Sequence, residues 1–398
     1  MTPSVLWTIQ AIHFSVCQLF TVTVCWLLFF PEWFDTTAEI TKNFYLYFFS
    51  IDNSIELFDI KNKKIFLRRT KCEGISLKDL YVGSMVTIFS RPMKIVDAVD
   101  DNTKIKVNKT LEKTFAMLKP YVINKMGEIL KTITAHNIHI ANIKMCLLDD
   151  YDVEKLYRNN EQLSRIKEYL TSGPVVTLML LGENVINRWN ELVGPSDHLP
   201  ETDSSSLRAH FAKSITENGF HGSLNLEAAE EELNYFFPNL KTKKKKKIKN
   251  SATLTNCTCC IVKPHAVQAE LTGDIVDDIQ KGGYRITAIQ EFNVDPVNAE
   301  EFLEVYKGVF ADYAAMVAEL QSGPCIAMEI THENKSIDVT VDFRKFCGPF
   351  DPEIARKIRP TTLRAKYGKT KIQNAVHCSD LPEDGPLEVE YFFNILDE

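Results

Sequence analysis

The 398-residue sequence lacks the signatures of several common catalytic and metal-binding sites. It contains no Gly-rich loop of the Walker type, no Ser-His-Asp order and no cluster with metal-ligand spacing. It also lacks an excess of positive charge, since 53 acidic residues outnumber 46 basic ones and give a net charge of −7. These absences argue against P-loop nucleotide binding, triad hydrolysis and a general attraction to nucleic acid, so any basic recognition must be local.

The ten cysteines lack the spacing of a small secreted disulfide scaffold. We expect reduced, small core residues of an intracellular protein. Only the run Cys257–Cys260 suggests a metal site. It has no second pair at zinc-finger spacing and continues directly into Ile261-Val262, so it predicts a strand instead.

Long hydrophobic runs are lacking after residue 30, but Val5–Phe30 carries no Asp, Glu, Lys or Arg. These 26 residues are long enough to span a bilayer, as in a signal peptide or signal anchor. However, no basic residue precedes the run, and polar residues such as His13 interrupt it. An atypical first exon or a helix that packs on a partner remain the alternatives, and we favour them over membrane insertion.

Composition divides the chain into five segments. They are a hydrophobic head (1–30), a β-rich docking module (31–109), two repeated domains (110–240 and 254–398) and a Lys-rich linker between them (241–253). In the module, the segment Asn43–Arg69 consists of runs of aromatic and β-branched residues. These runs are interrupted by the turn residues Asp52–Ser54 and Lys61–Lys63, a pattern that predicts hairpins. The module carries no catalytic constellation, so we expect it to bind or dock.

The linker is dominated by lysine. Lys241–Lys249 holds seven lysines in nine positions, and like charges at that density repel and stay extended. A solvated linker is the simpler interpretation. The alternative is contact with an acidic surface, such as a tubulin tail or nucleic acid.

The strongest signal is an internal repeat, because four motifs recur in the same order. The pairs are Met117–Pro120 with Ile261–Pro264, Ser172–Pro174 with Ser322–Pro324, Asn218–Ser223 with Asn374–Ser379, and Tyr235–Phe237 with Tyr391–Phe393. The separation grows along the chain only by loop-sized insertions. We therefore expect two copies of one fold.

Each copy alternates strand and helix patterns. In the second copy we predict strands at Thr258–Val262, Tyr284–Asn293 and Cys325–Ile330, and helices at Gly273–Gly282 and Ala299–Val309. This order predicts an α/β (α+β) sandwich in which helices cover a sheet.

Each copy also contains one histidine in a chemically suggestive context. His221 and His377 both follow an asparagine by three residues and precede a glutamate by eleven. A phosphoryl carrier needs a nucleophile that is uncharged near neutral pH, a partner that fixes its tautomer, and fixed positive charge for the phosphate oxygens. Histidine, glutamate and arginine meet these needs, so we expect at least one of the two histidines to be a nucleophile.

With these motifs, both copies resemble nucleoside diphosphate kinase domains. The resemblance covers about residues 31–398 and extends to a long family member with a β-rich module and two kinase-like copies, found with cilia and microtubules. It implies two tandem ferredoxin-like α/β sandwich domains preceded by a small β-rich PH-like domain.

The resemblance assigns roles residue by residue in the second copy. His377 would be the nucleophile, positioned by Ser379 and Glu388. The nucleotide-binding residues would be Lys263, Tyr306, Arg344, Arg364 and Asn374. Two positions depart from the family: Phe350 replaces a phosphate-binding threonine, and Cys378 replaces the glycine beside the histidine.

The first copy matches less completely. His221 is the counterpart of the nucleophile, and the other residues in place are Lys119, Arg208, Asn218, Ser223 and Glu232. The position of the first arginine holds Asn190, with Arg188 nearby, and the segment around Tyr157 is shorter than the family pattern. We expect nucleotide binding, slow turnover or a supporting role from this copy.

The resemblance implies γ-phosphoryl transfer from nucleoside triphosphates to diphosphates through phosphohistidine, with Mg²⁺ arriving on the nucleotide and no dedicated metal site. The two copies would pair as an internal pseudo-dimer. The expected location is the cytoplasm and the cytoskeleton of a cilium or flagellum, on axonemal microtubules. The rival hypothesis is a structural axonemal microtubule-associated protein, luminal in position, with weak or no kinase activity.

Overall fold

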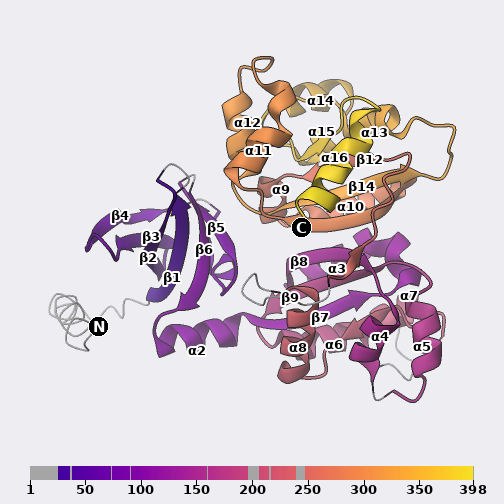
Figure 1. Ribbon diagram of the computed structural model, residues 1–398, viewed down its shortest axis with the longest axis horizontal. Coiled ribbons are helices and arrows are strands. Elements are labelled where there is room, and N and C mark those ends of the chain that lie inside the picture. Colours follow the sequence, from indigo (N-terminus) through magenta and orange to yellow (C-terminus); the bar gives the residue numbers. More distant parts are fainter. Residues whose placement is uncertain are drawn as a thin grey trace.

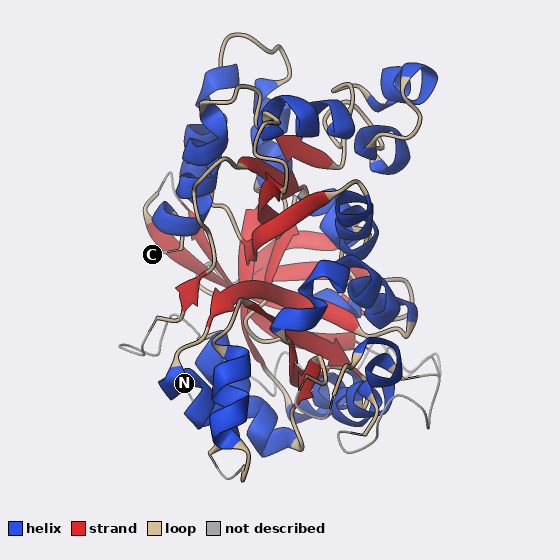
Figure 2. Ribbon diagram, turned by 90° about the vertical axis from the view of Figure 1, so that its right-hand side faces the viewer, coloured by secondary structure: helices blue, strands red, loops and turns tan. Residues whose placement is uncertain are grey.

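The computed structural model describes residues 26–35, 38–72, 74–89, 91–158, 160–195, 206–214, 217–238 and 247–397. They form a six-stranded sheet near the N-terminus and a nine-stranded sheet shared by the two repeated domains (Figure 1). All the described strand pairs are antiparallel. The predicted α/β (α+β) class is confirmed, with helices on the outside of the strands (Figure 2).

The β-rich module is a curved sheet in the order β4-β3-β2-β1-β6-β5. Its strands are β1 (Trp26–Asp35), β2 (Ile40–Phe49), β3 (Ser54–Asp59), β4 (Lys64–Lys71), β5 (Met85–Ile88) and β6 (Arg91–Ala98), with a 3₁₀ turn at Leu77–Asp79 and the helix α2 (Asp101–Thr110). The predicted hairpins are confirmed. Asn53 and Lys63 adopt positive φ angles in the two turns, a conformation that asparagine tolerates better than most residues.

The end of the hydrophobic head belongs to this sheet. The sequence boundary at residue 30 needs correction, because residues 26–30 lie in β1 and pair with both β2 and β6. Leu27 and Phe29 are buried there, as expected for alternate residues facing a core. The rest of the run, Val5 to residue 25, lies outside the described residues. None of the helices described is long and apolar enough to cross a membrane.

The two repeated domains contain matching elements. The first comprises β7 (Glu112–Leu118), a 3₁₀ segment (Pro120–Lys125), α3 (Met126–Ala135), β8 (His139–Leu147), α4 (Asp150–Tyr157), α5 (Leu163–Leu170), β9 (Val175–Gly182), α6 (Val185–Val193), α7 (Leu207–Phe211), β10 (Phe220–Gly222) and α8 (Leu226–Phe236). The second comprises β12 (Thr258–Val262), α9 (Pro264–Gln268), α10 (Thr272–Lys281), β13 (Tyr284–Phe292), α11 (Pro296–Phe302), a 3₁₀ turn (Glu304–Tyr306), α12 (Tyr313–Leu320), β14 (Cys325–His332), α13 (Val339–Cys347), α14 (Pro352–Ile358), α15 (Leu363–Tyr367), β15 (Val376–Cys378), α16 (Asp384–Glu390) and a π-helical turn (Tyr391–Ile395).

Four of the five elements predicted in the second copy are confirmed within about two residues. The predicted helix Ala299–Val309 is wrong beyond Phe302, where α11 ends. A 3₁₀ turn at Glu304–Tyr306 follows instead, and Val305 and Val309 are 71% and 74% exposed. Gly308, with φ of 78°, also breaks the helical path.

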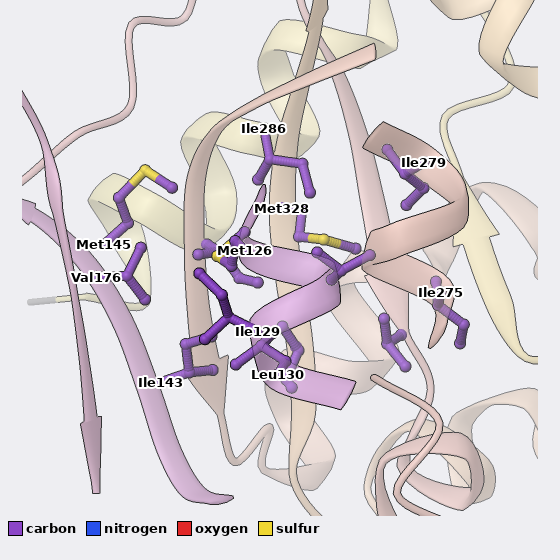
Figure 3. Packing of buried hydrophobic residues seen from close by; sticks show 14 of the residues in the cluster. Met126, Ile129, Leu130, Ile143, Met145, Val176, Ile275, Ile279, Ile286 and Met328 are labelled. Atoms are coloured by element: carbon purple, nitrogen blue, oxygen red, sulfur yellow. The ribbon is translucent and has the colours of Figure 1, made fainter. Parts of the chain in front are cut away.

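The two copies join edge to edge into one sheet. β8 of the first pairs with β13 of the second at Lys144 and Gln290, giving the order β10-β7-β9-β8-β13-β14-β12-β15. Helices α3 and α10 pack together over this joint, and Met126, Ile129 and Leu130 lie near residues of the second copy such as Ile275 (Figure 3). The copies therefore share one hydrophobic cluster, and each copy has a second cluster of its own on the opposite side of the sheet.

The C-terminal end of the predicted linker is also part of this joint. β11 (Lys249–Asn250) pairs with β8, so the linker segment 241–253 is not solvated throughout, as the simpler interpretation required. Residues 241–246 lie outside the described part of the chain.

One ion cluster ties the three domains together. The Glu270 carboxylate of the second copy accepts a hydrogen bond from Lys78 Nζ of the β-rich module at 2.8 Å and contacts His139 Nδ1 of the first copy at 3.1 Å. The hydrogen bond with His139 is the main cause that lowers the pKa of Glu270 to about 2, ahead of the opposing effect of burial. The carboxylate therefore stays charged across the physiological range.

Close contact of α3 with α10 depends on two glycines. A Cβ atom at Gly127 would lie 2.2 Å from the backbone nitrogen of Asp277, and one at Gly273 would lie 2.8 Å from that of Lys131. We expect Gly127→Ala to lower the free energy of unfolding by about 2–3 kcal/mol, because rigid backbone must move. Urea denaturation would measure it.

The matched control is Gly182→Ala, where the new Cβ would meet its nearest atom at an ordinary 3.6 Å. We expect a change within about 0.5 kcal/mol there. Equal, small changes at both positions would show that the helices are not held this closely.

Candidate active site

His377 lies on the short edge strand β15, which pairs with β12. Its Nε2 is 2.8 Å from Glu388 Oε2 on α16, and the same oxygen accepts a hydrogen bond from Ser379 Oγ at 2.9 Å. A carboxylate partner fixes the tautomer with the proton on Nε2. In the part of the chain that is described, nothing hydrogen-bonds to Nδ1, so its lone pair is available.

Two opposing effects act on the pKa of His377. Burial lowers the pKa of His377, but the charge and hydrogen bond of Glu388 outweigh it and leave the pKa above its usual value. The glutamate therefore positions the ring and also stabilises its positive form.

A cavity of about 510 Å³ opens beside His377, and cationic side chains gather on its walls. They come from α13 (Arg344), α15 (Arg364) and the residue before α9 (Lys263). Lys263 and Arg364 are both buried, and burial, with Arg364 as a second cause, lowers the pKa of Lys263 to about 7. A cavity whose wall carries two buried basic side chains is suited to an anionic ligand.

The Arg364 guanidinium is fixed by backbone carbonyls. Its Nη1 donates to Gly348 O at 2.9 Å and its Nε to Val376 O at 3.1 Å. Since Val376 directly precedes His377, this contact couples the position of Arg364 to that of the histidine.

Asp380 is a residue that sequence reasoning missed. Its carboxylate accepts a hydrogen bond from Tyr306 at 2.8 Å and pairs with Arg344 Nη2 at 3.1 Å. It therefore orients two of the predicted nucleotide-binding side chains. The available signal was its place three residues after His377, directly after the repeated motif Asn374–Ser379.

Asn374 is fully buried next to the cavity, and its amide nitrogen donates to Phe350 O at 3.0 Å. Its Oδ1 is buried without a hydrogen-bond partner. A buried unsatisfied acceptor is costly, which is consistent with a ligand hydroxyl completing the site. Phe350 cannot supply the hydroxyl of the threonine that it replaces, and its ring lies near Lys263 and Arg364.

The first copy repeats the histidine geometry with one decisive difference. His221 Nε2 contacts Glu232 Oε1 at 3.0 Å, and Ser223 donates to the same carboxylate. However, the hydroxyl of Tyr157 lies 3.0 Å from His221 Nδ1. The nitrogen that is free in the second copy is therefore occupied in the first.

The cations of the first copy bind groups of the protein itself. Lys119 Nζ donates a hydrogen bond to Asn218 Oδ1 at 2.7 Å. The equivalent oxygen in the second copy, Asn374 Oδ1, has no hydrogen-bond partner. Burial, followed by the nearby Arg208, lowers the pKa of Lys119 to about 7. Arg208 donates to Gly194 O and to Phe220 O, as its counterpart does in the second copy.

Two further contacts of the second copy have no counterpart here. The Asn190 amide donates to Ile186 O and Ser223 O, while Arg188 donates to Glu183 O and His136 O, so neither replaces the missing arginine at the histidine. The position matching Asp380 holds Leu224, which is 87% exposed. The first copy therefore lacks the counterparts of both Arg344 and its acidic partner Asp380.

Comparison with known proteins supports this assignment of two related domains. The family model for "Nucleoside diphosphate kinase" matches residues 112–242 and again residues 256–397. The chain belongs to the nucleoside diphosphate kinase family. Over 376 residues it is 42% identical to "Nucleoside diphosphate kinase homolog 7" of Rattus norvegicus and 43% identical to the protein of that name from Mus musculus, with 93% of each chain covered.

Among solved structures, the nucleoside diphosphate kinase of Aquifex aeolicus is 34% identical over 35% of this chain and 96% of its own, with a TM-score of 0.33. The similarity to the two homologs spans the β-rich module as well as both kinase-like copies. The resemblance inferred from the repeated motifs is therefore confirmed.

A nucleoside diphosphate kinase of this family would be expected to use Mg²⁺, so the fit of the residues to a metal matters. No group of three or more His, Cys, Asp or Glu that could hold a metal ion occurs among the described residues. The cavity walls offer cations and an amide oxygen, while Asp380 already binds Arg344 and Tyr306. This donor set fits phosphate and hydroxyl groups better than a bare metal ion.

Proposed function

We propose that the protein transfers the γ-phosphoryl group of a nucleoside triphosphate to a nucleoside diphosphate through phosphohistidine at His377. The observation that carries the proposal is the unoccupied Nδ1 of His377 at the wall of a cavity lined by Lys263, Arg344 and Arg364. In the first copy Tyr157 occupies the equivalent nitrogen, so we assign the chemistry to the second copy.

The residues imply a simple sequence of steps. Glu388 holds the Nε2 proton, which leaves the Nδ1 lone pair to attack the γ-phosphorus. The N–P bond forms as the bond from phosphorus to the bridging oxygen breaks, and the diphosphate leaves with the electron pair. Lys263 and the arginines stabilise the charge on the phosphoryl oxygens. A second diphosphate reverses the steps, and magnesium bound to the nucleotide phosphates would supply further charge neutralisation.

The test is to incubate the intact protein with ATP radiolabelled at the γ-phosphate and then add unlabelled GDP. We expect an acid-labile, base-stable label on the protein that moves to GTP. An intact, folded protein that takes up no label would contradict the proposal.

The two shifted pKa values predict a bell-shaped pH dependence of kcat/KM. The nucleophile must be neutral, so activity falls as pH drops below the raised pKa of His377. Lys263 must be charged to meet phosphate, so activity also falls as pH rises above its pKa of about 7 in the free protein. We expect a narrow maximum near neutral pH with losses of about tenfold per pH unit on each side.

Lys263→Arg provides the control for the alkaline limb, because arginine stays charged at every accessible pH. The variant should keep the acidic limb and lose the alkaline one. If the wild-type kcat/KM stayed constant from neutral pH upward, the lowered pKa of Lys263 in the nucleotide-free protein would be contradicted.

A second candidate function, docking on an acidic cytoskeletal surface such as tubulin, is favoured by strand β4. It lies at the end of its sheet, pairs only with β3 among the strands described, and exposes Lys64, Arg68 and Lys71. Phe66 is 38% exposed among these charges. A basic strand edge with an exposed aromatic residue can add an acidic extended segment.

We expect the double variant Lys64→Glu/Arg68→Glu to weaken cosedimentation with microtubules by about tenfold at low salt. The double variant Arg285→Glu/Lys335→Glu makes the same charge change on exposed residues of the second copy. Equal loss in both variants would indicate nonspecific charge attraction and count against docking through β4.

A further inference from the structure

Three cysteines lie together directly behind the nucleophile. Cys378 follows His377 on β15, Cys260 is its cross-strand partner on β12, and Cys347 ends α13. All three are buried within the same hydrophobic cluster, and all are free thiols. The sequence had singled out Cys378 as a departure from the family's glycine, and nothing in the phosphoryl-transfer steps uses it.

The arginine of the active site connects two of these cysteines. Arg364 Nη1 donates to the carbonyl of Gly348, the residue after Cys347, while Nη2 lies 3.6 Å from Cys378 Sγ. One planar guanidinium therefore spans the two positions. Cys378 is 2% exposed, but it is among the residues that line the cavity next to His377, and we expect a small oxidant to approach from that side.

The environment separates the reactivity of the two thiols. The hydrogen bond from Cys347 is the main cause that lowers the pKa of Cys378, burial opposes it, and the positive charge of Arg364 adds to the lowering. Burial raises the pKa of Cys347 well above its usual value. A thiolate beside a protonated thiol and a cation is the arrangement found in reactive cysteine pairs.

We propose that Cys347 and Cys378 form an oxidisable dithiol that controls phosphoryl transfer at His377. Hydrogen peroxide is the oxidant. The Cys378 thiolate attacks one peroxide oxygen, which breaks the O–O bond and gives sulfenic acid and hydroxide. Cys347 then attacks the Cys378 sulfur, the S–S bond forms and water leaves. In total, two thiols lose two electrons and two protons, and peroxide is reduced to two waters.

The expected consequence for the site follows from bond lengths. A disulfide holds its sulfur atoms about 2.05 Å apart, closer than any contact between free thiols. Closing it draws Cys378 Sγ toward Cys347 and away from Arg364, and it moves the strand residue adjacent to His377. The dithiol itself is inferred from the burial of both cysteines in one cluster and from the contacts of Arg364 with Cys378 and with the residue after Cys347. Its effect on phosphoryl transfer rests on the function proposed above.

The experiment treats the full-length protein with a few equivalents of hydrogen peroxide and measures two properties. Peptide mapping without reductant is expected to show Cys347 linked to Cys378. Phosphoenzyme formation is expected to fall by about 10²-fold, as when one phosphate contact is removed, and to recover with dithiothreitol. The Cys347→Ala variant should resist this reversible loss, whereas Cys325→Ala, which removes a buried cysteine of another cluster, should behave as wild type.

The outcomes separate the two proposals, because peptide mapping does not depend on activity. A Cys347–Cys378 linkage in a protein that is never phosphorylated, even when reduced, would support the dithiol but overturn its control of phosphoryl transfer. An active protein in which peroxide produces no linkage, links Cys260 instead, or leaves activity unchanged despite the linkage would overturn the inference.

Discussion

Replacing His377 with alanine should reduce phosphoenzyme formation and phosphoryl exchange between nucleotides to background, a loss on the order of 10⁴-fold or more. The reason is that no other nitrogen in the described part of the cavity combines a free lone pair with a carboxylate on its opposite side. The measurement is uptake of label from ATP carrying a radioactive γ-phosphate. Because His377 is only partly buried, the variant should fold, and its thermal unfolding would verify this.

The equivalent substitution in the first copy provides the control. We expect His221→Ala to retain label within about twofold, since Tyr157 occupies Nδ1 of this histidine and Asn190 stands where an arginine is needed. If His221→Ala removed the label and His377→Ala kept it, the assignment of chemistry to the second copy would be wrong. The hydroxyl of Tyr157 would then have to move away when nucleotide binds.

The sequence was sufficient to predict the duplicated fold and the grouping of histidine, serine and glutamate in each copy, although it missed Asp380. Four of the five strands and helices predicted in the second copy end within about two residues of the predicted positions, because hydrophobic periodicity reflects local burial. The spacing of eleven residues between His377 and Glu388 likewise predicted that the two side chains contact each other. Both residues lie at fixed positions on neighbouring elements, so the repeat preserved their contact.

Contacts between elements far apart in the chain could not be predicted. The sequence placed Tyr157 in a shortened segment, but only the structure shows its hydroxyl on His221 Nδ1. In the second copy the related Tyr306 binds Asp380 instead. Since Leu224 stands where Asp380 would be, the first copy offers its tyrosine no carboxylate at that position. The loss of this acidic side chain therefore accompanies the contact between the Tyr157 hydroxyl and His221 Nδ1.

The joint between the copies shows the same limit. The pairing of β8 with β13 depends on strands from different domains meeting at one edge, and no local pattern specifies that register. The strand residues 26–30 were assigned to the hydrophobic head for a related reason. An uncharged run is compatible with a membrane helix or a buried strand, and the partner strands β2 and β6 decide between them.

The second large effect is expected at Arg364. Arg364→Lys should lower kcat/KM by about 10²–10³-fold, because lysine keeps the charge but loses the planar fork that spans Gly348 O, Val376 O and an incoming phosphate. Steady-state assays with ATP and a nucleoside diphosphate would measure the loss. The same substitution leaves buried carbonyls without donors, so a decrease in the unfolding temperature is expected as well.

Arg208→Lys distinguishes catalysis from stability, because Arg208 donates to the matching carbonyls, Gly194 O and Phe220 O, in the first copy. Both variants should therefore lose similar stability, while only Arg364→Lys loses activity. Equal activity in the two variants, at equal stability, would mean that Arg364 acts as a structural support alone. The phosphate charge would then have to be met by Lys263 and Arg344, and Arg344 would first have to release Asp380.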